Sequence, residues 1–140
     1  MSQFSEPFKI LKHNSVVVNK LEGTITLTYT LSTSGGPITD ASFTYSNQDQ
    51  SPPTQGPFTV TFTGPDSGGN YSGTTSMSPP LNIQGEGEFK SGTMTFNPTA
   101  NTLNGNFSSN AGGPPGDDDI TWQAGTGEGE EASRKASTHY

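Results

Sequence analysis

The chain has 140 residues, which is enough for one domain and too short for two ordinary ones. Only 26% of the residues are apolar and 14% are charged, both below the averages of globular domains, whereas Gly (18) and Pro (11) are frequent. This composition favours short strands joined by many turns and argues against helical bundles and helix-rich α/β folds.

The formal net charge of −7 repels phosphate backbones and anionic lipid, so we expect no nucleic-acid partner. The absence of Cys excludes disulfides, thiolate metal sites and cysteine nucleophiles. No apolar run approaches the roughly 18 to 20 residues of a membrane-spanning helix. No secretory signal pattern opens the chain either, which leaves the cytoplasm, or export without a cleavable signal, as the expected location.

The first 14 residues predict a segment separate from the domain. Phe4, Phe8 and Leu11 are spaced i, i+4, i+7, with Pro7 and polar residues between them. This spacing is compatible with one helical turn, or with an extended arm that packs on the domain or on a neighbouring molecule.

Alternation of apolar residues with Thr is the clearest pattern in the middle of the chain. In residues 23–31, Ile25, Leu27 and Tyr29 fall on odd positions and Thr falls on even ones. Because successive side chains of a strand point to opposite faces, this pattern predicts a strand with one buried face. Residues 43–45, 58–63 and 93–96 repeat it.

Turn residues separate the predicted strands at short intervals, as in Ser78-Pro79-Pro80. Short strands at this spacing predict a single all-β domain over residues 15–123, either an antiparallel β-sandwich or a small β-barrel of about eight or nine strands. We place the strands at 15–19, 23–32, 41–46, 58–63, 70–77, 81–89, 92–97, 102–108 and 119–123.

The inward positions of these strands predict the core. Its members are Ile25, Leu27, Tyr29, Leu31, Phe43, Tyr45, Phe58, Val60, Phe62, Tyr71, Leu81, Ile83, Phe89, Met94, Phe96, Leu103, Phe107, Ile120 and Trp122. Residues 124–140 have no large apolar residue before Tyr140, and we predict a disordered acidic tail there.

Catalytic motifs are missing from the sequence, and we expect no enzyme. The two histidines, His13 and His139, lie near the chain ends, and no phosphate loop, zinc-helix motif or dinucleotide fingerprint occurs. Glu86 and Glu88 would share one face of a predicted strand, as paired carboxylates of glycoside hydrolases do. Two solubilising charges on a wet face are the simpler interpretation.

The run Asp117-Asp118-Asp119 crowds three carboxylates in one loop. A Ca²⁺ ion would neutralise this charge, because Ca²⁺ takes six to eight oxygen ligands. The spacing is not that of an EF-hand, and a solvated loop that discourages edge pairing is the alternative interpretation.

Trp122 follows this acidic loop, and Tyr71 follows Asn70 after a Gly-rich loop. An aromatic ring beside carboxylates and amides suits a sugar, whose C–H face packs on the ring while its hydroxyls bind the polar groups. Trp122 also alternates correctly with Ile120, which favours a core position instead.

Rows of Thr form a further pattern: Thr24, Thr26, Thr28 and Thr30 in one strand, and Thr59, Thr61 and Thr63 in another. Adjacent rows on a flat sheet would make a regular hydroxyl array of the kind that binds ice. Ordinary solvent-facing Thr is the simpler interpretation.

The sequence therefore predicts a non-catalytic, lectin-like domain that binds carbohydrate through loops at one end of the scaffold, with Trp122, Tyr71 and Asn70 as ligand-binding residues and Asp117–Asp119 as the Ca²⁺ site. The first alternative is a structural or surface protein that forms homo-oligomers through its N-terminal arm. The second is a small barrel that holds an apolar ligand.

Overall fold

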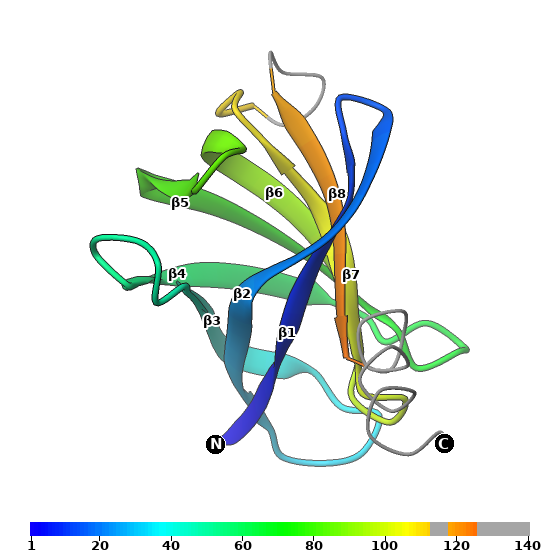
Figure 1. The fold of residues 1–140 in the computed structure, drawn as a ribbon. Helices are drawn as coiled ribbons and strands as arrows, with labels where there is room; N and C mark the ends of the chain where they lie inside the picture. Colours follow the sequence, from blue (N-terminus) through cyan, green and yellow to red (C-terminus); the bar gives the residue numbers. More distant parts are fainter. Residues whose placement is uncertain (113–117, 126–140) are drawn as a thin grey trace, which may run out of the picture.

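A computed structural model describes residues 1–112 and 118–125. They form eight antiparallel strands without a helix (Figure 1). The strands are β1 (Ser2–His13), β2 (Val16–Leu31), β3 (Ile38–Ser46), β4 (Thr54–Thr63), β5 (Tyr71–Ile83), β6 (Gly87–Asn97), β7 (Thr102–Ser108) and β8 (Asp119–Gly125). The described part of the chain holds no helix that is long and apolar enough to cross a membrane.

Each strand pairs with the next one in sequence, and β1 pairs with β8, so the sheet closes into a small barrel. The barrel alternative of the all-β prediction is therefore the correct one. Successive connections alternate between the two ends of such a barrel. We call the end that carries the β1–β2, β3–β4, β5–β6 and β7–β8 connections the β1–β2 end, and the opposite one the β2–β3 end.

The prediction of a separate N-terminal arm is wrong. Residues 2–13 are β1, hydrogen-bonded to β2 on one side and β8 on the other, and Phe4, Phe8 and Ile10 are buried in the core. Positions 4, 8 and 10 share one face of a strand, but Pro7 and the bulge between Ile10 and Lys12 obscure the alternation. The i, i+4 spacing that suggested a helical turn fits either structure.

Two other boundaries differ from the sequence prediction. The predicted strands 15–19 and 23–32 are one strand, β2. Residues 70–77 and the beginning of 81–89 are likewise one strand, β5, which turns into β6 at residues 84–86. The diproline Pro79-Pro80 does not reverse the chain but lies in an irregular stretch of β5 between Ser76 and Leu81.

That irregular stretch interrupts the pairing of β4 with β5, which covers only residues 60–63 and 72–75. Prolines there lack the N–H that a ladder requires. The side-chain amide of Gln55 replaces the missing backbone partner of Asn82 in β5. Its Nε2 donates to the Asn82 carbonyl oxygen (2.7 Å), and its Oε1 accepts from the Asn82 N–H (2.8 Å).

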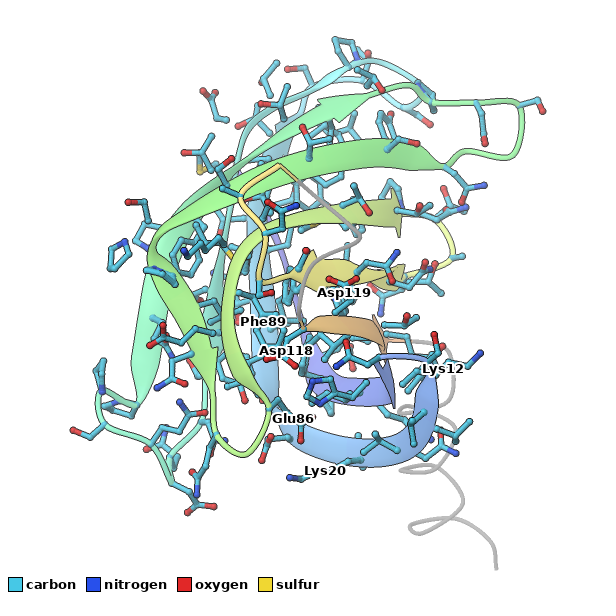
Figure 2. All side chains as sticks on the ribbon, turned by 90° about the horizontal axis from the view of Figure 1, so that it is seen from above. Lys12, Lys20, Glu86, Phe89, Asp118 and Asp119 are labelled. Atoms are coloured by element: carbon cyan, nitrogen blue, oxygen red, sulfur yellow. The ribbon has the colours of Figure 1, made fainter. Side chains whose placement is uncertain are left out.

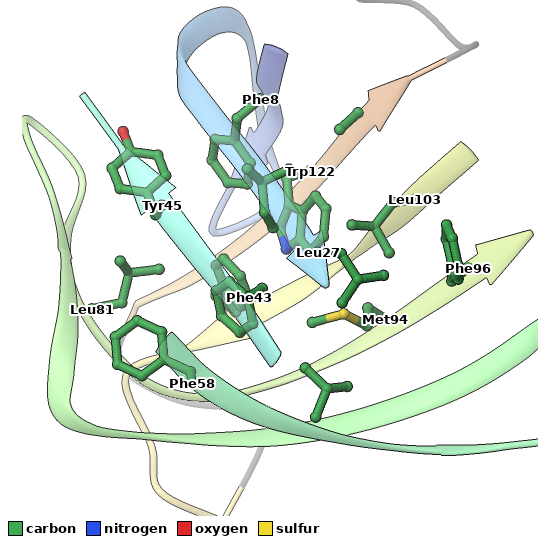
Figure 3. Close-up of a cluster of buried hydrophobic side chains, with 14 of the residues drawn as sticks. Phe8, Leu27, Phe43, Tyr45, Phe58, Leu81, Met94, Phe96, Leu103 and Trp122 are labelled. Atoms are coloured by element: carbon green, nitrogen blue, oxygen red, sulfur yellow. The ribbon is translucent and has the colours of Figure 1, made fainter. Parts of the chain in front are cut away.

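Aromatic and aliphatic side chains fill the interior of the barrel (Figure 3). The predicted core residues are buried, except that Tyr29, Leu31 and Phe62 are only partly buried against the others. The sequence did not predict Phe4, Phe8, Ile10, Ile38, Ala41, Met77 and Ala124, which complete the core. Ala124 and Gly125 belong to β8, so the predicted tail is left with residues 126–140, which lie outside the described residues.

Phe8 tests whether the N-terminal strand is part of the core. Its ring has no exposed surface and packs against Tyr45 (centroids 5.4 Å apart), Trp122 (5.1 Å) and Phe107 (6.1 Å). We expect Phe8→Ala to lower the free energy of unfolding by about 3–5 kcal/mol in urea denaturation, because truncating a buried ring leaves a cavity. Gln3→Ala, on an exposed position of the same strand, is the control. Equal stability of the two variants would mean that β1 is not part of the folded core.

Candidate functional site

Both aromatic rings predicted to stack on a sugar are buried. Trp122 has no exposed surface and lies between Phe8 and Phe107, with centroid distances of 5.1 and 5.0 Å. Tyr71 is 2% exposed, and its hydroxyl donates to the Gly36 carbonyl oxygen. Tyr71 does border a pocket of about 370 Å³ at the β2–β3 end, but its ring presents almost no surface for stacking.

The polar residues of the predicted site lie at opposite ends of the barrel. Asn70 precedes β5 at the β2–β3 end, where its side-chain oxygen accepts from Asn97 Nδ2 (3.1 Å). Asp118 and Asp119 lie at the β1–β2 end, where β8 begins. The fold therefore does not bring Asn70 and the acidic loop into one site.

Within the described residues, no group of three or more His, Asp or Glu side chains is arranged to hold a metal ion. Asp117 of the predicted Ca²⁺ site lies outside those residues. The Asp119 N–H donates to Asn14 Oδ1 (2.8 Å), and its carbonyl oxygen accepts from the Asn14 N–H (2.8 Å). The Asp118 carboxylate contacts the imidazole ring of His13.

A charged cluster of three side chains, His13, Glu86 and Asp118, lies at the β1–β2 end, and Figure 2 labels Glu86 and Asp118. His13 Nδ1 lies 2.8 Å from Glu86 Oε1, and His13 Nε2 lies 3.0 Å from Asp118 Oδ1. A neutral imidazole has only one N–H, so with both carboxylates ionised the two contacts are hydrogen bonds only when the ring carries both protons. The cluster joins β1, the β5–β6 turn and the residue before β8.

Glu86 is the best shielded carboxylate of this cluster, with a side chain only 8% exposed. Lys20 Nζ lies 3.7 Å from Glu86 Oε2 and 3.3 Å from Glu22 Oε1. Burial raises the pKa of the Tyr45 hydroxyl to about 12. A hydrogen bond from Asn47 opposes this shift, and the negative charges of Glu22 and Glu86 add to it.

These contacts indicate a structural role for the cluster, because they join three connections of the barrel. Each ring nitrogen of His13 is already matched with a carboxylate, and Asn14 Nδ2 also donates to Asp118 (3.2 Å). The hypothesis of a Glu86–Glu88 pair fits the structure poorly, because Glu86 lies in a turn and contacts His13 whereas Glu88 is exposed on β6. The cluster fastens three connections at the β1–β2 end.

The outer wall of the barrel carries a different feature, built from two rows of uncharged polar side chains. The registers of β4–β5, β5–β6 and β6–β7 align them across the strands. The first row is Thr61, Thr74, Thr93 and Asn106, and the second row is Thr63, Ser72, Thr95 and Asn104.

Between the two rows runs a groove of about 380 Å³ whose floor is the backbone at Gly73, Met94 and Gly105. The missing side chain of Gly73 leaves room for the Phe62 ring, and that of Gly105 lets β7 approach the backbone of β6. A Cβ on Gly73 would lie 2.7 Å from the Phe62 ring, and one on Gly105 would collide with the Thr93 carbonyl oxygen. We call this feature, lined by the two rows and their floor, the threonine groove. None of the residues that line it is charged.

Most of the polar groups in the threonine groove are not used by the fold. Thr63 Oγ1 donates to the Ser72 carbonyl oxygen (3.4 Å), and Asn106 Oδ1 accepts from Thr121 (2.9 Å). Within the described residues, no hydrogen bond uses the remaining side chains, which are Thr61, Ser72, Thr74, Thr93, Thr95 and Asn104. The groove therefore presents hydroxyls and an amide that can each donate and accept.

Sequence reasoning found the Thr alternation of two strands of this groove, residues 58–63 and 93–96, but did not pair them. It compared Thr61 and Thr63 with the Thr row of β2, which β3 separates from β4. The missed signal was the same alternation in Ser72-Gly73-Thr74 and Asn104-Gly105-Asn106, where Gly occupies the inward position.

No family model matches the chain, and comparisons with curated proteins and with solved structures find no match.

The charged cluster generates a pH prediction. Hydrogen bonds from His13, and then from Asn14, lower the pKa of Asp118 below its ordinary value. A carboxylate of this kind stabilises the fold above its ordinary pKa, and the contribution disappears as the pH falls through the folded-state pKa. We expect Asp118→Asn to lower the Tm near neutral pH and to differ less from the unmodified protein in acid. Asp49→Asn, in an exposed loop, is the control, and a pH-independent deficit would contradict the assignment.

Proposed function

We propose that the protein is a non-catalytic carbohydrate-binding domain and that the threonine groove is its binding site. The observation that carries the proposal is the two aligned rows of uncharged hydroxyl and amide groups whose hydrogen-bonding capacity the fold leaves unused. The site thus lies on the barrel wall, and not on loops at one end.

The chemistry of the groove favours a neutral, hydroxyl-rich ligand. Sugar hydroxyls donate and accept, as Thr, Ser and Asn side chains do, so each ligand hydroxyl finds a partner in either direction. The absence of charge among the lining residues provides no attraction for sulfated, phosphorylated or uronic acid chains. No aromatic ring lines the groove, so hydrogen bonds, and not stacking, would hold the ligand.

The direction of the groove favours a linear chain. It crosses β4, β5, β6 and β7, and neighbouring strands lie ~4.8 Å apart. This interval is close to the length of one sugar unit in an extended β-linked polysaccharide, so each strand would present one pair of side chains to each sugar unit. A linear oligosaccharide fits this arrangement better than a monosaccharide does.

Loss of two central hydroxyls tests the site. We expect the double variant Thr74→Val/Thr93→Val to bind neutral linear oligosaccharides about tenfold more weakly or worse, because each lost hydrogen bond costs ~0.5–1.5 kcal/mol. The assay is calorimetry, after a screen of gluco-, xylo-, manno- and chito-oligosaccharides and their polymers. The matched control is Thr28→Val/Thr44→Val, two outward positions on β2 and β3 whose hydroxyls likewise make no hydrogen bond within the described residues.

Three outcomes would contradict the proposal. In the first, no neutral glycan binds the unmodified protein. In the second, the double variant binds as tightly as the control, which would place the site elsewhere. In the third, the unmodified protein slows ice recrystallisation and the double variant does not, so that the hydroxyl rows bind ordered water. Binding in EDTA that equals binding in Ca²⁺ would further separate this site from the acidic loop.

A further inference from the structure

The two polar rows of the outer wall continue beyond the threonine groove. The β7–β8 register places Thr121 beside Asn106, and the Thr121 hydroxyl donates to Asn106 Oδ1 (2.9 Å). The same register places Gln123 beside Asn104. Trp122 between them is buried in the core, so Thr121 and Gln123 lie on the outer wall. The first row therefore extends to Thr121 and the second to Gln123.

On the next strand, both rows end in a lysine. β8 pairs with β1 (Figure 1), and the register places Lys12 opposite Thr121 and Lys9 opposite Gln123. Ile10 is buried, so the two lysines belong to the outward positions of β1. Lys12 is exposed, and its ammonium group makes no ion pair or hydrogen bond with the residues that the structure describes. The β1 end of the rows is therefore positively charged.

The opposite end of the rows carries a negative charge. Asp40 of β3 and Thr61, the first member of the first row, line one hollow on the outer wall. Asp40 is exposed, and across residues 1–112 and 118–125 its carboxylate has no hydrogen-bonding or ionic partner. The path from β3 to β1 is thus negative at its start, uncharged along the threonine groove and positive at its end.

We propose that the ligand of the threonine groove is a linear glycan with a neutral body and one end unit that carries a carboxylate, which Lys9 and Lys12 bind. The inference rests on the proposed function, because it assigns a narrower class of ligand to the same groove. Ammonium groups attract a carboxylate and Asp40 repels it. The acidic unit therefore lies at β1, and the neutral end of the glycan points toward β3.

The distribution of charge limits the ligand to a single acidic end. A polyanionic chain would place carboxylates over the uncharged rows and beside Asp40, and the formal net charge of −7 repels it as a whole. From β4 to β1 the rows take five steps between neighbouring strands, which at ~4.8 Å a step span ~24 Å. A chain of about six sugar units covers this distance.

Matched hexasaccharides test the acidic end by calorimetry. In the gluco series the probes are cellohexaose, its C1-oxidised aldonic acid, and the same chain with a uronic acid at its non-reducing end. The reduced alditol is the control, because its terminal ring is also open but carries no charge. The corresponding xylo- or manno-hexasaccharides are used where that series is the one that binds.

We expect a carboxylate at one of the two chain ends to strengthen binding about two- to fivefold over the neutral chain, as exposed ion pairs do. In about 1 M NaCl, where the Debye length is ~3 Å, this preference should disappear. Lys12→Gln should also lose the preference, whereas Lys12→Arg, which keeps the charge, should retain it. Lys90→Gln, exposed on β6 outside the groove, is the matched control and should bind all probes as the unmodified protein does.

The results separate this inference from the proposed function. Binding of the neutral hexasaccharide without any gain from a carboxylate at either end overturns the inference and leaves the proposed function intact. A gain of equal size in Lys12→Gln, or tighter binding of hexagalacturonic acid than of the chain with one acidic end, also overturns it. If no probe binds, the proposed function fails and the inference fails with it.

Discussion

The pairing of β1 with β8 is the constraint on which the rest of the structure depends. Sheets present two edges unless they close, and in this chain the first strand supplies the contact that closes the last. Closure also places Phe8 among Tyr45, Phe107 and Trp122, so that strand pairing and packing of the core reinforce each other at the same residue.

A closed and filled barrel restricts where a ligand can bind. The rings of Phe8, Phe43, Phe107 and Trp122 occupy the interior, and a charged cluster centred on His13 fastens the turns at the β1–β2 end. On the outer wall, the strands from β4 to β7 keep a continuous register and carry the threonine groove. Side chains that alternate inward and outward along these strands therefore form the core on one face and line the proposed binding groove on the other.

The sequence predicted the fold class and most of the core because alternation is a local property. Ile25, Leu27 and Phe43 can be assigned to the buried face from their neighbours alone. β1 was missed because Pro7 and a bulge interrupt that local pattern. Trp122 had two interpretations, and its alternation with Ile120 correctly favoured the core.

The site was harder to predict because it depends on which strands are neighbours. Thr61, Thr74, Thr93 and Asn106 form a row only through the registers of the barrel, and the alternation within each strand does not say which strands are neighbours. His13 and Glu86 are far apart in sequence and meet because their turns share one end of the barrel. No local pattern in the sequence specifies such a contact.

The order in which the strands are synthesised gives the β1–β8 pairing a kinetic consequence. β1 leaves the ribosome first and can form a hairpin with β2 at once, since only Asn14 and Ser15 separate His13 from its partner Val16. Its other partner, β8, is the last strand to emerge, and pairings of such large sequence separation form slowly. Until then the apolar face of the hairpin has no completed core to cover it, so the nascent chain remains open to aggregation until β8 has emerged.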